Sequence, residues 1–189
     1  MEKNLNKSIK TKQRFYYAYV GLLENTPTLS IKVQQLTNEL GLNRITFYNH
    51  FSNMELFREQ CIYFYIERLY AFVKPLNYKP YEKGFEYDAL VQLLNHIAQE
   101  KATYKILLNS EKIPEFNKLL LLFFQKKIQK HTEELARINF PGTNVELEIV
   151  AWYGVSALFG TVIMWAQSDF RYSPIQLAQS IQNLTPSFK

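Results

Sequence analysis

The sequence predicts an all-α protein in which a three-helix N-terminal unit precedes a larger helical region, with about nine helices in total. Apolar residues recur at helical spacing in one segment after another, and no strand-like alternation, hairpin turn or internal repeat stands out. Of the 189 residues, 47% are hydrophobic and 15% are aromatic, which is ample for a packed core. Two short helices separated by a tight turn are predicted near the N-terminus, and they define the smaller unit.

The first predicted helix runs from about residue 9 to residue 24, after a basic arm formed by residues 1–8. Five basic residues and one acidic residue fall within the first fourteen positions, and Lys10, Lys12 and Arg14 begin the helix. Residues 61–189 carry fourteen basic and twelve acidic side chains and are nearly neutral. The surplus of basic residues that gives the net charge of +5 therefore lies near the N-terminus, where it could attract a phosphate backbone. Taken alone, such clusters are more often solvated charges on a helix.

The next two predicted helices have the spacing of a helix-turn-helix. The first carries Val33, Leu36 and Leu40 on one side. It breaks at Gly41, and the second helix begins at Asn43. That second helix is short and rich in hydrogen-bonding and aromatic side chains. A helix that keeps one apolar side for its own core and turns polar groups outward can enter a DNA major groove, so we interpret this stretch as a DNA reader.

The larger region is predicted to contain six helices. Their expected limits are residues 53–73, 87–98, 102–108, 114–138, 144–168 and 173–184. Prolines and a glycine between residues 74 and 84 give the longest loop signal, and Pro141-Gly142 separates two of the helices. The helix that begins at residue 53 is apolar over much of its circumference, which suits a buried connector between the two units.

The stretch from Ile149 to Ala166 has eighteen consecutive uncharged residues, the length at which a membrane span must be considered. Its flanking residues Glu146, Glu148 and Asp169 are acidic and lack the cationic bias of a cytoplasmic anchor. Small residues within the stretch would let another helix approach closely. We therefore expect this helix to be covered on every side by other protein helices, and we expect no membrane partner.

The sequence gives no support for an enzyme, a metal site or a bound cofactor. It has no glycine-rich phosphate loop, no His-Glu-x-x-His motif and no serine-elbow pattern. The single cysteine, Cys61, excludes an internal disulfide and a multi-cysteine zinc site, and we expect a buried structural thiol. His96 and His131 are isolated in the sequence and are expected to be ordinary helix residues. The polar N-terminus carries no secretory signal, so a cytoplasmic location is expected.

The residues of the second short helix are more specific than its spacing. The run Phe47-Tyr48-Asn49-His50-Phe51 resembles the end of the recognition helix in the TetR family of bacterial transcriptional regulators, where an aromatic residue, Tyr, any residue, His and Phe occur in this order. The resemblance is specific over roughly residues 10–57. Beyond these residues only the helical architecture is similar. It implies a helix-turn-helix DNA-binding domain at residues 1–52 and a helical regulatory and dimerisation domain at residues 53–189.

Two positions depart from the family pattern. Met54 stands where the family usually places a Lys that reaches a phosphate, so one phosphate contact is expected to be lost or moved. Lys32 stands where a Thr or Ser often caps the first helix of the motif, and Ser30 is the expected cap instead. The Lys32 side chain could contact a phosphate or remain a solvated charge.

The resemblance implies a homodimer whose two recognition helices enter successive major grooves about 34 Å apart on a palindromic operator. The expected DNA-binding residues are Lys32, Asn43, Arg44, Ile45, Thr46, Phe47, Tyr48, Asn49 and His50, with Lys10, Lys12 and Arg14 as further phosphate contacts. By the family match, Tyr48 and His50 should hold phosphates and set the register. Phe47 is ambiguous between the groove and the core.

The remaining residues of the helix are candidates for reading bases. Arg44 is expected to read a guanine or else hold a phosphate. Ile45 and Thr46 are expected to approach thymine methyl groups, and Asn49 to face the groove, where it could pair with adenine.

In this family the last two long helices of each chain pair in a four-helix bundle, and a ligand in the second domain shifts the dimer between DNA-competent and incompetent forms. The expected dimer contacts are Trp152, Val155, Phe159, Val162, Ile163, Leu177 and Ile181. An apolar or aromatic inducer is the expected ligand, with Tyr104, Phe116, Phe123 and Trp152 as candidate contacts. For any one of these four, a place in the core is the alternative.

The resemblance thus implies a dimeric regulator, expected to be a repressor, that binds double-stranded DNA and responds to a small molecule. The alternative is a TetR-like co-regulator or protein-interaction scaffold with weak or no sequence-specific DNA binding, which the loss of a contact at Met54 would favour. A membrane-associated form is a third possibility, which solubility without detergent would test.

Overall fold

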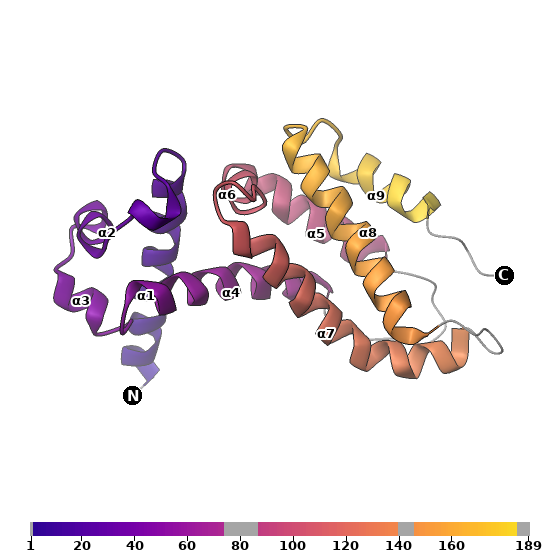
Figure 1. Cartoon of the computed structure of the whole chain (residues 1–189), viewed down its shortest axis with the longest axis horizontal. Coiled ribbons are helices and arrows are strands. Elements are labelled where there is room, and N and C mark those ends of the chain that lie inside the picture. Colours follow the sequence, from indigo (N-terminus) through magenta and orange to yellow (C-terminus); the bar gives the residue numbers. More distant parts are fainter. Residues whose placement is uncertain (1, 74–86, 140–145, 185–189) are drawn as a thin grey trace.

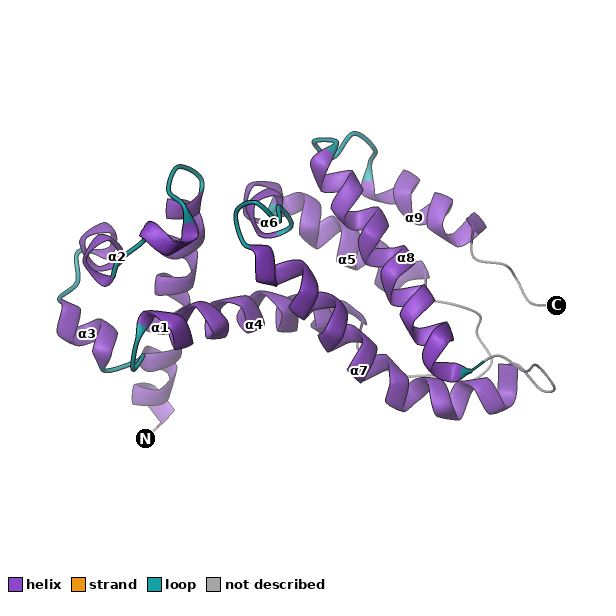
Figure 2. Cartoon of the chain, viewed as in Figure 1, coloured by secondary structure: helices purple, strands orange, loops and turns teal. Residues whose placement is uncertain are grey.

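The structure, a computed structural model, describes residues 2–73, 87–139 and 146–184. Within these ranges it contains nine α-helices, one short 3₁₀ turn and no strand (Figure 1 and Figure 2). The predicted all-α class is therefore confirmed. The loop expected over residues 74–84 and the break at Pro141-Gly142 lie outside the described residues.

The first three helices form a group at one end of the molecule (Figure 1). They are α1 (Glu2–Leu23), α2 (Val33–Leu40) and α3 (Arg44–Tyr48), with the 3₁₀ turn η1 (Thr28–Ser30) between α1 and α2. Because α1 begins at Glu2, the expectation that residues 1–8 form an arm outside the helix is wrong for residues 2–8. Apolar periodicity marks only the packed part of a helix, and the polar turns before it contain no Gly or Pro to stop the helix.

Helix α4 (Met54–Val73) runs from the first group of helices into the second (Figure 1). Its buried side chains are Phe57, Cys61, Ile62, Tyr65, Ile66 and Leu69. A helix that is apolar on several sides must be covered on several sides. Aromatic side chains of α1 cover its first half, and α5 and α7 pack against it further along.

The second group consists of α5 (Tyr87–Gln99), α6 (Lys101–Leu107), α7 (Pro114–Asn139), α8 (Leu147–Gln167) and α9 (Pro174–Leu184). Helices α7 and α8 pack along each other, and α9 lies against α5 (Figure 1). As predicted, α9 is capped by Ser173, whose Oγ accepts a hydrogen bond from the Gln176 N–H at 3.3 Å. No helix in the described ranges combines the length and hydropathy that a membrane crossing requires.

The buried side chains of both groups form one continuous cluster. Its largest fully buried members include Phe15, Phe47, Phe51 and Phe57 from the first group and α4, and Tyr104, Phe116, Phe124 and Phe159 from the second. Cys61 lies in this core, where burial raises the pKa of its thiol well above the ordinary value. A buried thiol of raised pKa is unreactive, so Cys61 has the structural role that was predicted.

Candidate nucleic-acid interface

The turn between α2 and α3 is fixed by a glycine and a side-chain cap. Gly41 follows α2 with a φ of 62°, a left-handed conformation that glycine adopts at no steric cost. The Leu42 N–H donates to the Thr37 carbonyl at 2.8 Å and closes the end of α2. Asn43 Oδ1 accepts a hydrogen bond from the Ile45 N–H at 3.0 Å and starts α3. The predicted break at Gly41 and restart at Asn43 are confirmed.

The inner side of α3 is held by Phe47. Its ring is fully buried and meets Phe15 of α1 edge-on, with the ring centroids 5.5 Å apart. Phe51, just after α3, is also buried and packs edge-on against Phe57 of α4 at 4.9 Å. Edge-to-face contacts of this kind add to the stabilisation from burial. Phe47 is therefore an anchor of α3 with no surface to offer DNA, which corrects its place among the expected contacts.

The outer side of α3 carries most of the expected DNA-binding residues. Arg44, Ile45, Tyr48 and Asn49 are exposed, and Thr46 is half-buried. Ile45 is 67% exposed and Tyr48 is 56% exposed, although burial is the usual state of side chains so large and apolar. Arg44 donates to Oε1 of Gln34 in α2, which holds the side chain at the surface while other guanidinium donors remain.

His50 lies where the end of the motif meets the first turns of α1. Its Nδ1 is 3.3 Å from Ser8 Oγ. Burial, followed by the charge of Lys12, lowers the pKa of His50, so the ring is neutral at pH 7 and offers hydrogen bonds. Lys12 Nζ lies 5.5 Å from the centroid of the Phe51 ring. Sequence reasoning missed Ser8, because nothing around it in the sequence marks a contact 42 positions away.

The other basic candidates lie beside the same motif. Lys10 is exposed, and the exposed Arg14 donates to a backbone carbonyl at the end of α2 at 3.3 Å. Lys32 is the N-cap residue of α2, and its backbone N–H donates to Gln35 Oε1 at 2.8 Å. The expected cap, Ser30, instead ends the 3₁₀ turn, so that prediction is wrong. The Lys32 side chain is exposed at the start of α2.

The four candidate ligand contacts lie in different surroundings. Tyr104 and Phe116 are fully buried in the core, and the Tyr104 hydroxyl is 2.8 Å from His96 Nε2. Phe123 is partly buried, and Trp152 is exposed on α8. The described residues form a groove of about 420 Å³ between α1 and α4 and a pocket of about 290 Å³ beside α5, and none of the four lines either one. No group of three or more His, Cys, Asp or Glu side chains in the described ranges could hold a metal ion.

The expected dimer contacts lie mostly on the wrong side of their helices. Val155, Phe159, Val162 and Leu177 are buried inside their own chain. Ile163 and Ile181 are partly buried against the same core, and Trp152 alone is exposed. A side chain without exposed surface has none to give to a second chain. The four buried residues are therefore core residues, which corrects their selection as contacts.

The opposite side of α8 carries an exposed apolar stripe, formed by Ile149, Tyr153, Ala157, Gly160 and Met164. These positions are three or four residues apart and so share one side of the helix. Tyr153 is 76% exposed and Met164 is 63% exposed, and α8 has no charged residue after Glu148. Contiguous exposed apolar surface of this kind usually marks an interaction site.

The chain matches a family model described as a transcriptional regulator C-terminal region, TetR_C_8, over residues 86–187. Among curated proteins, none matches it. Its fold is similar to that of the fatty acid degradation regulator FadR from Bacillus halodurans, with 19% sequence identity and a TM-score of 0.60 over 92% of this chain and 93% of that one. That likeness extends the shared fold to the helix-turn-helix end. Because the family model covers more than half of the sequence, this chain belongs to the TetR family of transcriptional regulators.

Proposed function

We propose that this chain is a dimeric repressor that inserts α3 of each subunit into the major groove of a palindromic operator. The observation that carries the proposal is the two-sided character of α3. Phe47 anchors its inner side in the core, whereas Ile45, Tyr48 and Asn49 project into solvent. A short helix with one buried side and a protruding outer side, placed after a tight turn, suits groove insertion. Residues 1–52 would then form the DNA-binding domain and residues 53–189 the regulatory domain.

The proposed contacts divide into groups that read bases and groups that hold the backbone. Arg44 would read a guanine or hold a phosphate, and Asn49 would pair with adenine. Ile45 would contact thymine methyl groups, since its exposed side chain has no polar group. Tyr48 and His50 would hold phosphates and set the register.

Further backbone contacts come from basic side chains next to the motif. Lys10 and Lys32 are exposed there, and Lys12 and Arg14 lie beside the ends of α3 and α2. These four cations would neutralise phosphates, so binding should weaken steeply with added salt. Met54 packs against the core and its thioether has no hydrogen to donate, so it would make no phosphate contact.

The exposed stripe on α8 supports the dimeric part of the proposal. Tyr153 and Met164 supply large apolar surfaces, and the exposed Ala157 and Gly160 between them would let a partner helix approach closely. A second copy covering the stripe would remove this surface from water. The exposed Ile175 of α9 would lie at the edge of the same contact.

Release from the operator would be controlled by a small apolar or aromatic ligand bound among the helices of the second group. Support for this part comes from the family and from the apolar, aromatic character of that region. The name of the similar structure describes a regulator of fatty acid degradation, and an acyl compound is one member of the proposed ligand class. We place the protein in the cytoplasm, where a bacterial operator is accessible.

Selection of DNA from a random pool by the purified chain tests the proposal. We expect enrichment of a two-fold symmetric site with half-sites about 10 base pairs apart, or a multiple of that spacing. Binding to the selected duplex should show a steep salt dependence, because several cations displace counterions. A chain that enriches no site and shows no salt slope is instead a TetR-like interaction scaffold, and the DNA-binding proposal would then be withdrawn.

A further inference from the structure

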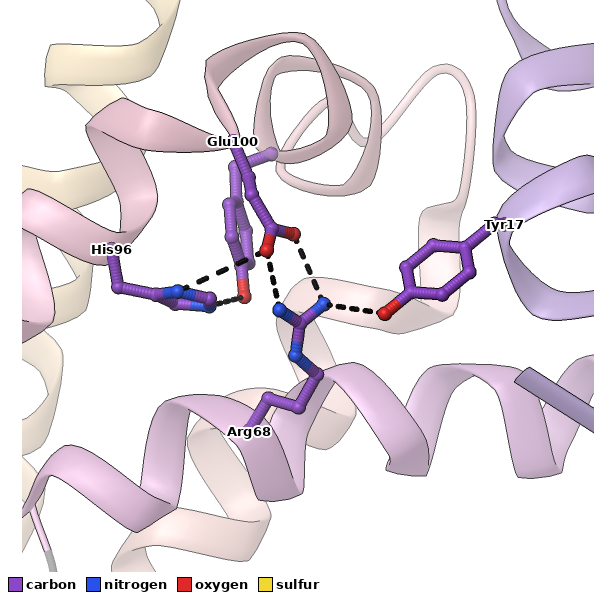
Figure 3. Close-up of polar contacts among 5 residues, drawn as sticks. Tyr17, Arg68, His96 and Glu100 are labelled. Carbon is purple, nitrogen blue, oxygen red and sulfur yellow. Dashed lines mark hydrogen bonds and ion pairs between the residues drawn. The ribbon is translucent and has the colours of Figure 1, made fainter. Parts of the chain in front are cut away.

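Polar side chains from four helices meet where the first group of helices adjoins the second (Figure 3). Arg68 of α4 lies at the centre and donates from both terminal nitrogens to the carboxylate of Glu100, between α5 and α6. The Nη1–Oε2 distance is 3.0 Å, and the same nitrogen is 3.5 Å from the Tyr17 hydroxyl of α1. One guanidinium therefore connects α1, α4 and the α5–α6 junction.

The pair is held in a largely aromatic surrounding. The Arg68 guanidinium carbon lies 5.6 Å from the ring centroid of Phe64, 5.8 Å from that of Tyr65 and 6.0 Å from that of Tyr17. Burial lowers the pKa of Arg68, but the hydrogen bonds and charge of Glu100 outweigh it, so the pKa of Arg68 is raised overall. Removing either partner would leave the other partly desolvated and without its counterpart.

On the side away from Tyr17, His96 lies beside the Glu100 carboxylate (Figure 3). His96 Nε2 is 2.8 Å from the Tyr104 hydroxyl, and His96 Nδ1 is 4.0 Å from Glu100 Oε1. Phe72 stacks on the imidazole with the ring centroids 4.8 Å apart. Because burial lowers the pKa of His96, the ring is neutral at pH 7. Because the Glu100 carboxylate lies on the Nδ1 side of the ring, the tautomer with Nδ1–H is favoured, and in that tautomer the Tyr104 hydroxyl donates to Nε2.

A second polar contact joins the two groups at the end of α1. Thr28 Oγ1 donates to the Lys112 carbonyl at 2.5 Å, and Lys112 Nζ donates to the Glu24 carbonyl at 2.9 Å. Lys112 lies just before α7. The two groups are thus joined by the continuous helix α4, by a contact at Glu100 just before α6, and by contacts at Lys112 after it.

We propose that the Tyr17–Arg68–Glu100 contact is a latch that fixes the orientation of the helix-turn-helix group relative to the second group, so that DNA affinity depends on it. The inference rests on the proposed function. Helix α4 and the contact at Lys112 alone would still let the first group rock about α4. A charged group of α4 that also contacts α1 and the α5–α6 junction holds a single arrangement. The ligand-free arrangement would be the DNA-competent one, and opening the latch would weaken binding.

A double-mutant cycle on the full-length protein tests the latch, with the selected duplex as the probe. Arg68→Met and Glu100→Gln should each lower DNA affinity about five-fold or more, and the double variant should lose less than the product of the two. Tyr17→Phe removes only the hydroxyl and should lower affinity in the same direction. The matched control is the exposed ion pair between Lys105 and Asp169, where Lys105→Met and Asp169→Asn should leave affinity unchanged.

Hydrogen exchange separates failure of the latch from failure of the proposed function. In Glu100→Gln and Tyr17→Phe, backbone amides at the end of α1 and in α6 should exchange faster than in the parent, with or without DNA. If the parent protein selects no duplex, the repressor proposal fails while exchange still tests the latch. Variants with reduced thermal stability, unchanged DNA affinity and unchanged exchange in α1 and α6 would show that the pair is only structural, and the latch would be rejected.

Discussion

His96 is the residue at which acid should act on the second group of helices. Burial lowers the pKa of His96, and the nearby Glu100 opposes this effect only in part, while Arg68 adds to it. In the unfolded chain the imidazole has its ordinary pKa of about 6.5. As the pH falls below that value, the unfolded state therefore binds the proton before the folded state does. The free energy of unfolding must fall over this range, because lowering the pH stabilises the state that binds more protons, which here is the unfolded state.

We expect the Tm of the parent protein to decrease as the pH falls from about 7.5 to 5.5, and that of His96→Gln to decrease less. A glutamine can still accept the hydrogen bond from Tyr104, so the variant should fold. His50→Gln is a second test of the same effect, because the pKa of His50 is also lowered and its removal should flatten the profile in the same direction. Thermal melts followed by circular dichroism at each pH measure the effect. Parallel pH profiles for His96→Gln and the parent would contradict it.

Tyr48 and Asn49 are neighbours with different proposed roles, and two substitutions separate them. Tyr48→Phe should weaken binding to every duplex by a similar factor, since a phosphate hydrogen bond of about 1 kcal/mol carries no sequence information. Asn49→Ala should cost about 1–3 kcal/mol with the preferred base and relax discrimination at that position. Gel-shift titrations against the selected site and single-base variants measure both.

Tyr172→Phe is the matched control for the tyrosine change, because Tyr172 is comparably exposed but lies between α8 and α9. It should leave affinity for every duplex unchanged. If Tyr48→Phe altered discrimination at one base, or Asn49→Ala weakened all sites equally, the assigned roles would be reversed.

At the scale of the elements, the turn between α2 and α3 depends on the backbone conformation of one residue. Gly41 has a φ of 62°, where an added Cβ would clash with its own backbone although no other atom lies within 4 Å of it. We expect Gly41→Ala to lower the free energy of unfolding by about 1 kcal/mol. Chemical denaturation measures the change.

Gly21 provides the control for that substitution. It lies in α1 with ordinary helical geometry, and no atom lies within 4 Å of the position of an added Cβ. Gly21→Ala should therefore raise the free energy of unfolding by about 0.5–1 kcal/mol, because alanine loses less backbone entropy in a helix. A loss of stability in both variants would mean that conformation at Gly41 is not the cause.

Helix limits followed from the sequence wherever apolar periodicity and turn residues coincide. The break at Gly41 and the cap at Ser173 were predictable, because glycine and serine act there through their own backbone and hydroxyl. The start of α1 was not, since polar residues with good helix propensity extend a helix without apolar spacing. Capping at Lys32 was missed because it depends on the Gln35 side chain.

At the scale of the whole molecule, the sequence predicted the fold class and the position of the turn between α2 and α3, but not which side of α8 faces inward. Val155 and Tyr153 are both apolar enough to be buried, yet one is in the core and the other is 76% exposed. A helix that is apolar all round has no periodicity to distinguish its sides. The latch was also beyond prediction, because Tyr17 and Arg68 are 51 positions apart and meet only after folding.

The exposed stripe on α8 leads to a prediction about assembly. A charge placed where apolar surface is to be buried must be desolvated without a partner, which costs far more than the lost apolar contact. We expect Tyr153→Glu combined with Met164→Glu, two charges of the same sign that cannot pair with each other, to convert the dimer into a folded monomer with an unchanged helical spectrum. Sedimentation equilibrium measures the mass. The monomer should bind the selected operator weakly. In the dimer, binding of one subunit to its half-site holds the second subunit close to the other half-site, and this advantage is lost in the monomer.

Two controls determine what the result means. Leu29→Glu places a charge on a side chain of η1 that is 82% exposed, away from the stripe, and should leave the dimer intact. Val155→Ala creates a cavity in the core and should lower the free energy of unfolding by about 2 kcal/mol while the dimer persists. Because Val155 and Tyr153 lie on opposite sides of one helix, this pair of variants separates folding from assembly. If Val155→Ala dissociated the dimer and the double charge variant did not, the inward side of α8 would be the interface after all.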